Sequence, residues 1–233
     1  MSDKKEASGE KVGAVIVAAG KSQRMGEVDK LFISLGGRPL LVWATQPFQE
    51  CPLVHQIVVV VSGEKEALCR QLVASEEWSK VSDVCLGGRR RQDSVAAGLK
   101  RLQTCQWAII HDGARPFVTV ELIERGLEAA RETGAAVAAV PVKDTIKFAG
   151  DDGTIYQTPP RQNLWLVQTP QVFRIGLITE AYQKANEDAT DDASLVERLG
   201  YKVKLYPGSY DNIKITTPED LALAEVLWRK YER

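Results

Sequence analysis

The sequence predicts an α/β fold, a Rossmann-like and mainly parallel sheet with flanking helices, and two patterns support this prediction. Short apolar runs rich in β-branched residues alternate, along the chain of 233 residues, with amphipathic segments of helix length. The runs are almost continuously apolar, which is typical of strands that are covered on both faces. Strands and helices that alternate in this way form right-handed crossovers, and these generate a parallel sheet.

The predicted elements follow one another in a regular order. The expected strands are Val12–Ala18, Ile57–Val61, Val81–Leu86, Trp107–Ile110 and Ala135–Val142. The expected helices lie at about residues 39–50, 64–75, 92–104 and 119–133. Apolar residues recur at helical spacing in the third of these helices, and Thr119 can cap the fourth.

A final helix is expected to begin near residue 218. Thr217 can cap its first turn, Pro218 suits the first helical position, and two acidic residues follow directly. An apolar stripe then continues at Leu221, Ala224 and Trp228.

The regular alternation is interrupted at about residues 143–173. The Asp151-Asp152-Gly153 segment is typical of a hairpin turn, and Pro159, Pro160 and Pro170 exclude a long helix. We predict a β-arm that projects from the sheet. Its apolar side chains would need cover, and a partner subunit could provide it, so the arm is expected to support a homodimer. An arm folded back on its own domain is the alternative.

Composition excludes several classes of protein. Lys and Arg total 30 against 31 Asp and Glu, so no net positive field would attract nucleic acid or an anionic membrane surface. No apolar run reaches the length of a membrane span, and residues 1–11 lack a secretory signal and are expected to form a disordered tail. The spacing of the four cysteines disfavours a disulfide framework, which indicates a cytoplasmic protein. With only two histidines, a structural zinc site has no candidate ligand set.

The loop after the first strand carries a phosphate-binding pattern. It combines the small residues Ala18, Ala19 and Gly20 with the cations Arg24 and Lys30. Small residues let the backbone approach a ligand closely, and cations stabilise the charge that develops in phosphoryl and nucleotidyl transfer. A Walker A loop is excluded because the position five residues before Gly20 is not glycine, and the spacing of a dinucleotide-binding fingerprint is also absent.

Two further segments can contribute to a site at the carboxyl edge of the sheet. Gly87-Gly88 follows a strand and Ser94 lies near the start of a helix, an arrangement that can receive a polar ligand. Asp112 follows a buried strand, where a single carboxylate suits Mg²⁺ that also binds substrate phosphates. His111, beside it, is interpreted as a packing or supporting residue.

Some charged residues have a simpler interpretation. Arg90 and Arg91 are expected to be surface arginines, and Lys214 would by default be an exposed residue of a strand over 213–215. The acidic cluster of Glu187, Asp188, Asp191 and Asp192 is expected to be solvated at the start of a helix, with a role in supporting the site left open.

In order along the chain, these segments resemble the 2-C-methyl-D-erythritol 4-phosphate cytidylyltransferase family. The resemblance extends from Val12 to Trp228. The motifs that carry it are Gly87-Gly88-Arg89-Arg90-Arg91-Gln92-Asp93-Ser94-Val95, His111-Asp112-Gly113-Ala114-Arg115-Pro116, Pro141-Val142-Lys143-Asp144-Thr145-Ile146-Lys147, Thr190-Asp191-Asp192-Ala193-Ser194 and Asp211-Asn212-Ile213-Lys214-Ile215-Thr216. Residues 12–233 would then be a single nucleotidyltransferase domain that joins CTP to a sugar-alcohol phosphate with Mg²⁺, as a homodimer.

The resemblance also implies roles for individual residues. The implied catalytic residues are Arg24, Lys30, Arg161 and Lys214. The implied nucleotide-binding residues are Ala18, Ala19, Gly20, Gly88, Arg89 and Ser94. The implied substrate-binding residues are Asp112, Gly113, Arg115, Thr145 and Thr169, with Asp112 also the metal ligand. Two alternatives stay open: another polyol phosphate such as ribitol 5-phosphate as the acceptor, and a non-catalytic regulator that binds nucleotide.

Overall fold

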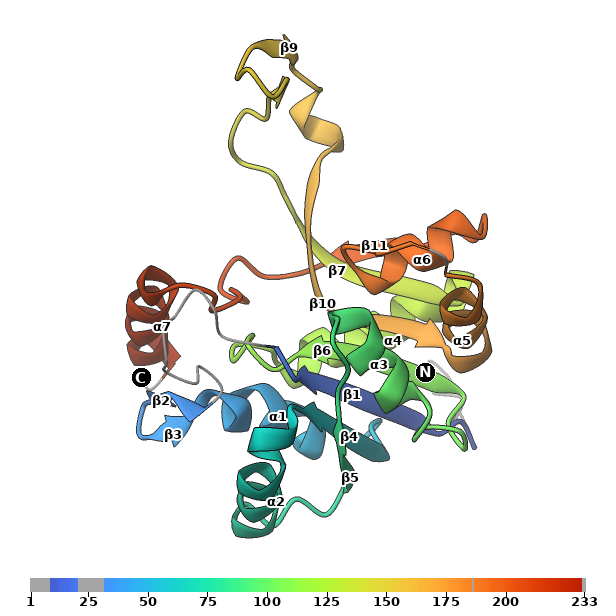
Figure 1. Cartoon of the computed structure of the whole chain (residues 1–233), viewed down its shortest axis with the longest axis vertical. Coiled ribbons are helices and arrows are strands. Elements are labelled where there is room, and N and C mark those ends of the chain that lie inside the picture. The colour runs from blue at the N-terminus through green and yellow to red at the C-terminus, as the bar shows by residue number, and fades with distance from the viewer. Residues whose placement is uncertain (1–8, 21–31, 186, 232–233) are drawn as a thin grey trace, which may run out of the picture.

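A seven-stranded sheet forms the centre of the molecule in the computed structural model, which describes residues 9–20, 32–185 and 187–231 (Figure 1). In chain order its strands are β1 (Val12–Ala18), β4 (Gln56–Val61), β5 (Val81–Leu86), β6 (Trp107–Asp112), β7 (Ala135–Pro141), β10 (Trp165–Arg174) and β11 (Lys204–Pro207). In space the order is β11-β7-β10-β6-β1-β4-β5. The pairs β1–β4, β1–β6, β4–β5 and β7–β11 are parallel, whereas β10 runs antiparallel to both of its neighbours. This arrangement confirms the predicted Rossmann-like, mainly parallel sheet.

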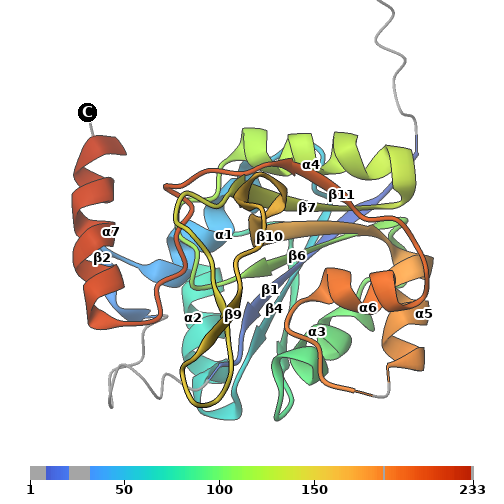
Figure 2. The same cartoon turned by 90° about the horizontal axis from the view of Figure 1, so that it is seen from above.

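Helices cover both faces of the sheet, and α4 and α3 lie on opposite sides of it in Figure 2. The helices are α1 (Leu40–Glu50), α2 (Glu66–Ser75), α3 (Arg91–Leu99), α4 (Val120–Thr133), α5 (Ile175–Lys184), α6 (Asp192–Arg198) and α7 (Pro218–Tyr231). One core joins the sheet to α1, α2 and α4, and a second core joins the other face to α3, α5 and α6. Burial on both faces explains why β1, β4, β6 and β7 are almost continuously apolar. Within the described residues, no helix is long and apolar enough to cross a membrane.

The strand register aligns the carboxyl ends of β1, β4, β5 and β6 at one edge of the sheet. Val17 of β1 pairs with Asp112 of β6, and Ala18 pairs with Val61 of β4. Val61 in turn pairs with Leu86 of β5. Because these strands are parallel, their carboxyl ends meet at one edge, where open α/β sheets bind ligands.

A long arm projects from the body of the molecule between β7 and β10, as Figure 1 shows. It contains β8 (Phe148–Ala149), β9 (Ile155–Gln157) and the short 3₁₀ helix η4 (Arg161–Asn163). Gly153 has a φ of 78°, a value that glycine adopts without a steric penalty, and it lies in the turn that joins β8 to β9. The predicted projecting arm and its turn are therefore present, and the alternative of an arm folded onto its own domain is wrong.

The end of the arm differs from the sequence-based expectation. Residues 165–173 were expected within the arm, but β10 returns along them into the central sheet between β6 and β7. Pro170 concealed this strand, because proline lacks the N–H that a central strand donates. The structure accommodates it where the β10–β7 register shifts, between Val167 and Gln171.

The last helix packs away from the sheet. Helix α7 lies near the two-stranded ribbon of β2 (Ser34–Leu35) and β3 (Arg38–Pro39), and the Trp43 and Trp228 rings lie 4.1 Å apart between their centroids. The expected cap is present, since the Asp220 amide donates to Thr217 Oγ1 over 3.3 Å. The expected strand over 213–215 is absent, because this segment runs irregularly and carries Lys214 toward the sheet edge.

Candidate active site

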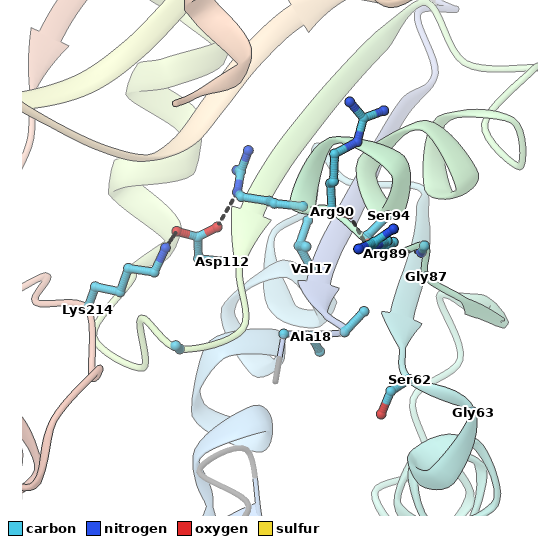
Figure 3. A pocket seen from close by; sticks show the side chains of 15 residues that line it. Val17, Ala18, Ser62, Gly63, Gly87, Arg89, Arg90, Ser94, Asp112 and Lys214 are labelled. Atoms are coloured by element: carbon cyan, nitrogen blue, oxygen red, sulfur yellow. Dashed lines mark hydrogen bonds and ion pairs between the residues drawn. The ribbon is translucent and has the colours of Figure 1, made fainter. Parts of the chain in front are cut away.

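The described residues form a pocket of about 670 Å³ at the carboxyl edge of the sheet. Figure 3 shows that its walls come from opposing segments, with Lys214 approaching Asp112 from one side and the 87–94 segment lying on the other. The lining residues include Val17, Ala18, Ala19, Gly20, Ser62, Gly63, Gly87, Gly88, Arg89, Arg90, Arg91, Ser94, Asp112, Ala114 and Lys214. Segments far apart in sequence thus meet in one cavity.

The wall expected to bind nucleotide is built from backbone and small side chains. A Cβ atom on Gly87 would lie only 2.4 Å from the Cβ of Ala19, so the two loops can approach this closely only with glycine at position 87. The Ser94 hydroxyl accepts a hydrogen bond from the Gly88 amide at 3.1 Å and donates to the Arg90 carbonyl at 3.1 Å. Ser94 therefore braces the turn that lines the pocket.

Asp112 lies at the end of β6 among several cations. Its side chain is 10% exposed, its Oδ1 accepts from Arg91 Nε at 3.1 Å, and its Oδ2 accepts from Lys214 Nζ at 2.8 Å. Arg115 Nε lies 3.8 Å from Oδ2. Burial alone would raise the pKa of this carboxyl group, but the charges of Arg91, Lys214 and Arg115 outweigh that effect and lower its pKa. Asp112 is therefore ionised near neutral pH.

A buried hydrogen-bond chain fixes the backbone at Asp112. The Asp112 amide donates to Thr169 Oγ1 at 3.1 Å, and that hydroxyl lies 3.0 Å from His111 Nδ1. His111 Nε2 lies 3.1 Å from the Arg115 carbonyl oxygen, which can only accept, so Nε2 carries the proton and Nδ1 accepts from Thr169. Burial lowers the pKa of His111 to about 4. The histidine is thus neutral near pH 7 and supports the site, in agreement with the sequence-based interpretation.

Arg91 differs from the expectation of a surface arginine. Besides Asp112, its guanidinium donates through Nη2 to Asp192 Oδ2 at 2.8 Å, and Asp192 is 1% exposed. Asp192 Oδ1 also accepts from the Tyr182 hydroxyl at 2.5 Å. The acidic cluster is therefore divided, since Asp192 is buried against the site whereas Glu187 and Asp188 are exposed. Arg90 agrees with the prediction and pairs at the surface with Asp93 and Asp188.

Sequence reasoning missed Arg91 because no local pattern distinguishes it. It is the last of three consecutive arginines, and its partner Asp192 lies 101 positions further along the chain. Only the start of α3 at Arg91 directs this one side chain toward β6 and α6.

The other predicted site residues fall into three groups. Gly113 and Arg115 follow Asp112 directly, and Arg115 Nη1 donates to the Asn212 carbonyl at 2.7 Å, which ties the segment before Lys214 to the site. Thr145 and Arg161 are exposed on the arm and do not line the pocket of their own chain. Arg24 and Lys30 lie outside the described residues.

The described part of the pocket offers few side chains that could bind a metal ion. The described ranges contain no group of three or more histidine, cysteine, aspartate or glutamate side chains placed to hold a metal ion. Among the described residues that line the pocket, Asp112 is the one carboxylate.

Comparisons with known proteins identify the family of this chain. A family model described as 2-C-methyl-D-erythritol 4-phosphate cytidylyltransferase matches residues 12–230. A relative of that name from Dehalococcoides mccartyi is 52% identical over 221 residues, covering 95% of this chain and 97% of the relative. Another from Caldanaerobacter subterraneus is 47% identical, covering 94% of this chain and 99% of the relative.

Solved structures give the same result. The crystal structure of a 4-diphosphocytidyl-2C-methyl-D-erythritol synthase from Anaerococcus prevotii matches with a TM-score of 0.85 at 31% identity, covering 96% of this chain and 99% of that one. The 2-C-methyl-D-erythritol 4-phosphate cytidylyltransferase of Thermus thermophilus matches with a TM-score of 0.76 at 37% identity, covering 94% and 99%. The chain therefore belongs to the 2-C-methyl-D-erythritol 4-phosphate cytidylyltransferase family.

Proposed function

We propose that this chain joins CTP and 2-C-methyl-D-erythritol 4-phosphate to give 4-diphosphocytidyl-2-C-methyl-D-erythritol and pyrophosphate. Family membership over residues 12–230 carries this proposal. The pocket supports it, because a wall of small residues and backbone faces a cluster of cations around one ionised carboxylate. Such a cavity suits a nucleotide on one side and an anionic acceptor on the other.

The reaction requires no strong general base. A phosphate monoester has a second pKa of about 6, so the acceptor phosphate is already largely ionised near neutral pH. One of its oxygens forms a bond to the α-phosphorus of CTP, and the bond from that phosphorus to the bridging oxygen of pyrophosphate breaks. No proton has to be removed from the acceptor phosphate, so the buried, neutral His111 is not required as a base.

The chain's own residues supply position and charge. The Gly87–Gly88 turn, Arg89, Ser94 and the loop from Ala18 to Gly20 would hold the nucleotide. Lys214, together with Arg24 and Lys30, would neutralise phosphate oxygens as charge develops on them. Arg115, Gly113 and Thr169 would shape the acceptor side through their contacts around Asp112.

Asp112 would provide the protein ligand for Mg²⁺. Its carboxylate has about four acceptor positions, and Arg91 and Lys214 occupy two of them, so the group fits a metal that is otherwise bound by water and phosphate. When bound, Mg²⁺ would neutralise charge on the phosphate oxygens of CTP.

The functional unit would be a homodimer. Thr145 and Arg161 lie on the arm, away from the pocket of their own chain, while apolar arm side chains such as Ile155 and Tyr156 are 56% and 70% exposed. If the arm packs on a second copy, it covers these side chains and brings Arg161 to the partner's acceptor phosphate. Residues 12–233 would act as one nucleotidyltransferase domain in the cytoplasm, where the four free cysteines would stay reduced.

A pyrophosphate-release assay tests the assignment. CTP, ATP, UTP and GTP would each be combined with methylerythritol phosphate and with ribitol 5-phosphate, in the presence of Mg²⁺. We expect release only with CTP and methylerythritol phosphate. Equal release with both acceptors would contradict the substrate assignment, and no release with any pair would favour a nucleotide-binding regulator.

A further inference from the structure

The side of Asp112 that faces away from Lys214 is held by a partly buried chain of charged and polar groups, in which Arg91 retains 30% exposure of its side chain. Arg91 donates from Nε to Asp112 at 3.1 Å and from Nη2 to Asp192 at 2.8 Å, so one guanidinium bridges both carboxylates. Tyr182 then donates to the remaining oxygen of Asp192 at 2.5 Å. Asp112, Lys214 and Arg91 line the pocket, whereas Asp192 and Tyr182 do not.

The far end of this chain is fixed to the body of the protein. Asp192 is the first residue of α6, and the adjacent Asp191 caps the helix by accepting from the Ser194 amide at 3.1 Å. Gln171 of β10 donates to Asp191 at 3.0 Å and accepts from the Ala193 amide at 3.1 Å. The position of Asp192 is therefore set by the sheet and not by the pocket.

The charges make this bridge sensitive to substitution. Asp192 is 1% exposed, and a buried carboxylate needs a paired cation, which Arg91 provides. Without the charge of Asp192, the guanidinium would keep Asp112 as its sole carboxylate partner and could move toward the pocket. Arginine suits the bridge because its planar group presents several N–H donors in fixed directions, which a lysine ammonium cannot reproduce.

We propose that Arg91 is a positioning residue for the acceptor side of the reaction, and that Asp192 and Tyr182 hold Arg91 in the orientation that places Asp112 opposite Lys214. This proposal rests on the proposed function, because it assumes that Asp112 and Lys214 meet the acceptor. Helix α6 thus contributes to the site through Arg91 without touching either substrate.

The Asp192→Asn variant tests this arrangement. Asparagine keeps the volume and an oxygen for the Tyr182 hydroxyl, but it removes the charge that holds Arg91. We expect kcat/KM for methylerythritol phosphate to fall by about tenfold to a hundredfold, the effect of losing a hydrogen bond between charged groups, with the KM for CTP within about twofold. Tyr182→Phe should shift the same constants in the same direction by a smaller factor.

Matched variants distinguish positioning from a general loss of structure. Glu187→Gln removes the same charge from an exposed side chain of the same acidic cluster, whose ion pair is with Arg198, so both substrate constants should stay near wild type. In the Arg91→Lys background, adding Asp192→Asn should have much less effect than in the wild type, because the bridge is already broken. A uniform rise in both KM values, unchanged constants in a stable Asp192→Asn protein, or additive effects in the double variant would overturn the proposal.

Failure of the proposed function would be visible separately. If the wild type releases no pyrophosphate from CTP and methylerythritol phosphate, a crystal structure of Asp192→Asn supplies the readout. A displaced Asp112 carboxylate would still support the positioning role of Arg91. A carboxylate that keeps its contacts with Arg91 and Lys214 would contradict it.

Discussion

Asp112 and Lys214 illustrate how the chain places opposite charges within one cavity. Asp112 is fixed through its amide by Thr169 and through its carboxylate by Arg91, so Lys214 approaches a carboxylate that is already held in place. Lys214 retains 38% exposure of its side chain, which leaves its ammonium group accessible to a ligand in the pocket. The Lys214 ammonium group can therefore contact a phosphate in the pocket as well as the Asp112 carboxylate.

Replacing Lys214 tests this at the level of one residue. We expect Lys214→Ala to lower kcat by about a hundredfold, the typical effect of losing one donor that stabilises developing charge. Steady-state pyrophosphate release measures the change. Lys204→Ala is the matched control, because Lys204 pairs with Glu132 at the surface of β11, and removing it should leave turnover near normal. Near-normal turnover in Lys214→Ala would exclude that residue from the mechanism.

At the scale of elements, α3 must approach the sheet closely for Arg91 and Ser94 to reach the site. Gly98 allows this approach, because a Cβ atom there would lie 2.4 Å from Cγ1 of Val15 in β1 and 3.0 Å from Cγ2 of Val60 in β4. Valine side chains are stiff and cannot move aside easily. The packing of α3 thus depends on the absence of one methyl group.

Gly98→Ala is therefore expected to lower the free energy of unfolding by about 1–3 kcal/mol through overpacking. Urea denaturation followed by circular dichroism measures it. Gly176 in α5 offers a matched control, since a Cβ atom there would contact no other atom within 4 Å. Gly176→Ala should be neutral or stabilise the protein by up to about 1 kcal/mol. Equal effects of the two substitutions would show that α3 can move away from the sheet.

The start of α7 provides a second test at this scale. Asp220 accepts from the Thr216 amide at 2.8 Å and the Thr217 amide at 2.9 Å, while its own amide donates to Thr217 Oγ1. Burial alone would raise the pKa of Asp220, but these hydrogen bonds lower it overall below its ordinary value of 3.8. Because the pKa is lower in the folded state, the stabilisation is complete above the ordinary pKa and is lost as the pH falls below it.

We therefore expect Asp220→Ala to lower the free energy of unfolding by about 1 kcal/mol near neutral pH, as other helix-cap losses do. The difference from wild type should decrease once the pH falls below 3.8, and denaturant unfolding at several pH values would measure this. Glu225→Ala, which removes an exposed charge from the same helix, is the control and should change the free energy of unfolding by less than about 0.5 kcal/mol near neutral pH. A constant difference at all pH values would contradict the role assigned to the carboxylate.

At the scale of the whole molecule, the arm carries Thr145 and Arg161, two predicted site residues, away from the pocket of their own chain. Phe148 and Trp165 are 44% and 40% exposed, an unfavourable arrangement for an isolated subunit. The proposed dimer would bury these side chains and place each Arg161 in the site of the other subunit. The site would then be complete only in the assembly.

Mixing two inactive variants tests this assembly. Arg161→Ala and Lys214→Ala subunits, co-expressed and mixed at random, should form heterodimers in which one of the two sites has both residues intact. About a quarter of wild-type activity should return, since half of the dimers would be mixed. Analytical ultracentrifugation provides the mass. A monomeric wild type, or no recovery of activity in confirmed heterodimers, would contradict a site shared between subunits.

Much of the fold could be predicted because its determinants are local. β1 has the predicted bounds because a buried parallel strand is a continuous apolar run, β5 also has the predicted bounds, and α7 begins where Thr217 and Pro218 indicated. The small-residue loop after β1 and the carboxylate at the end of β6 were also predictable, because each directly follows a recognisable strand.

The contacts between distant segments were decided only by the tertiary structure. Three arginines in a row are equivalent in sequence, yet only Arg91 is held between Asp112 and Asp192, 21 and 101 positions away. Without the family motif, Lys214 would have been assigned to an exposed strand position, but an irregular segment brings it to Asp112. The sequence by itself determined the class of fold and the edge of the sheet where the pocket lies, because both depend on local periodicity. The pairing of charges depends on which distant elements pack together, and this arises only when the chain is folded.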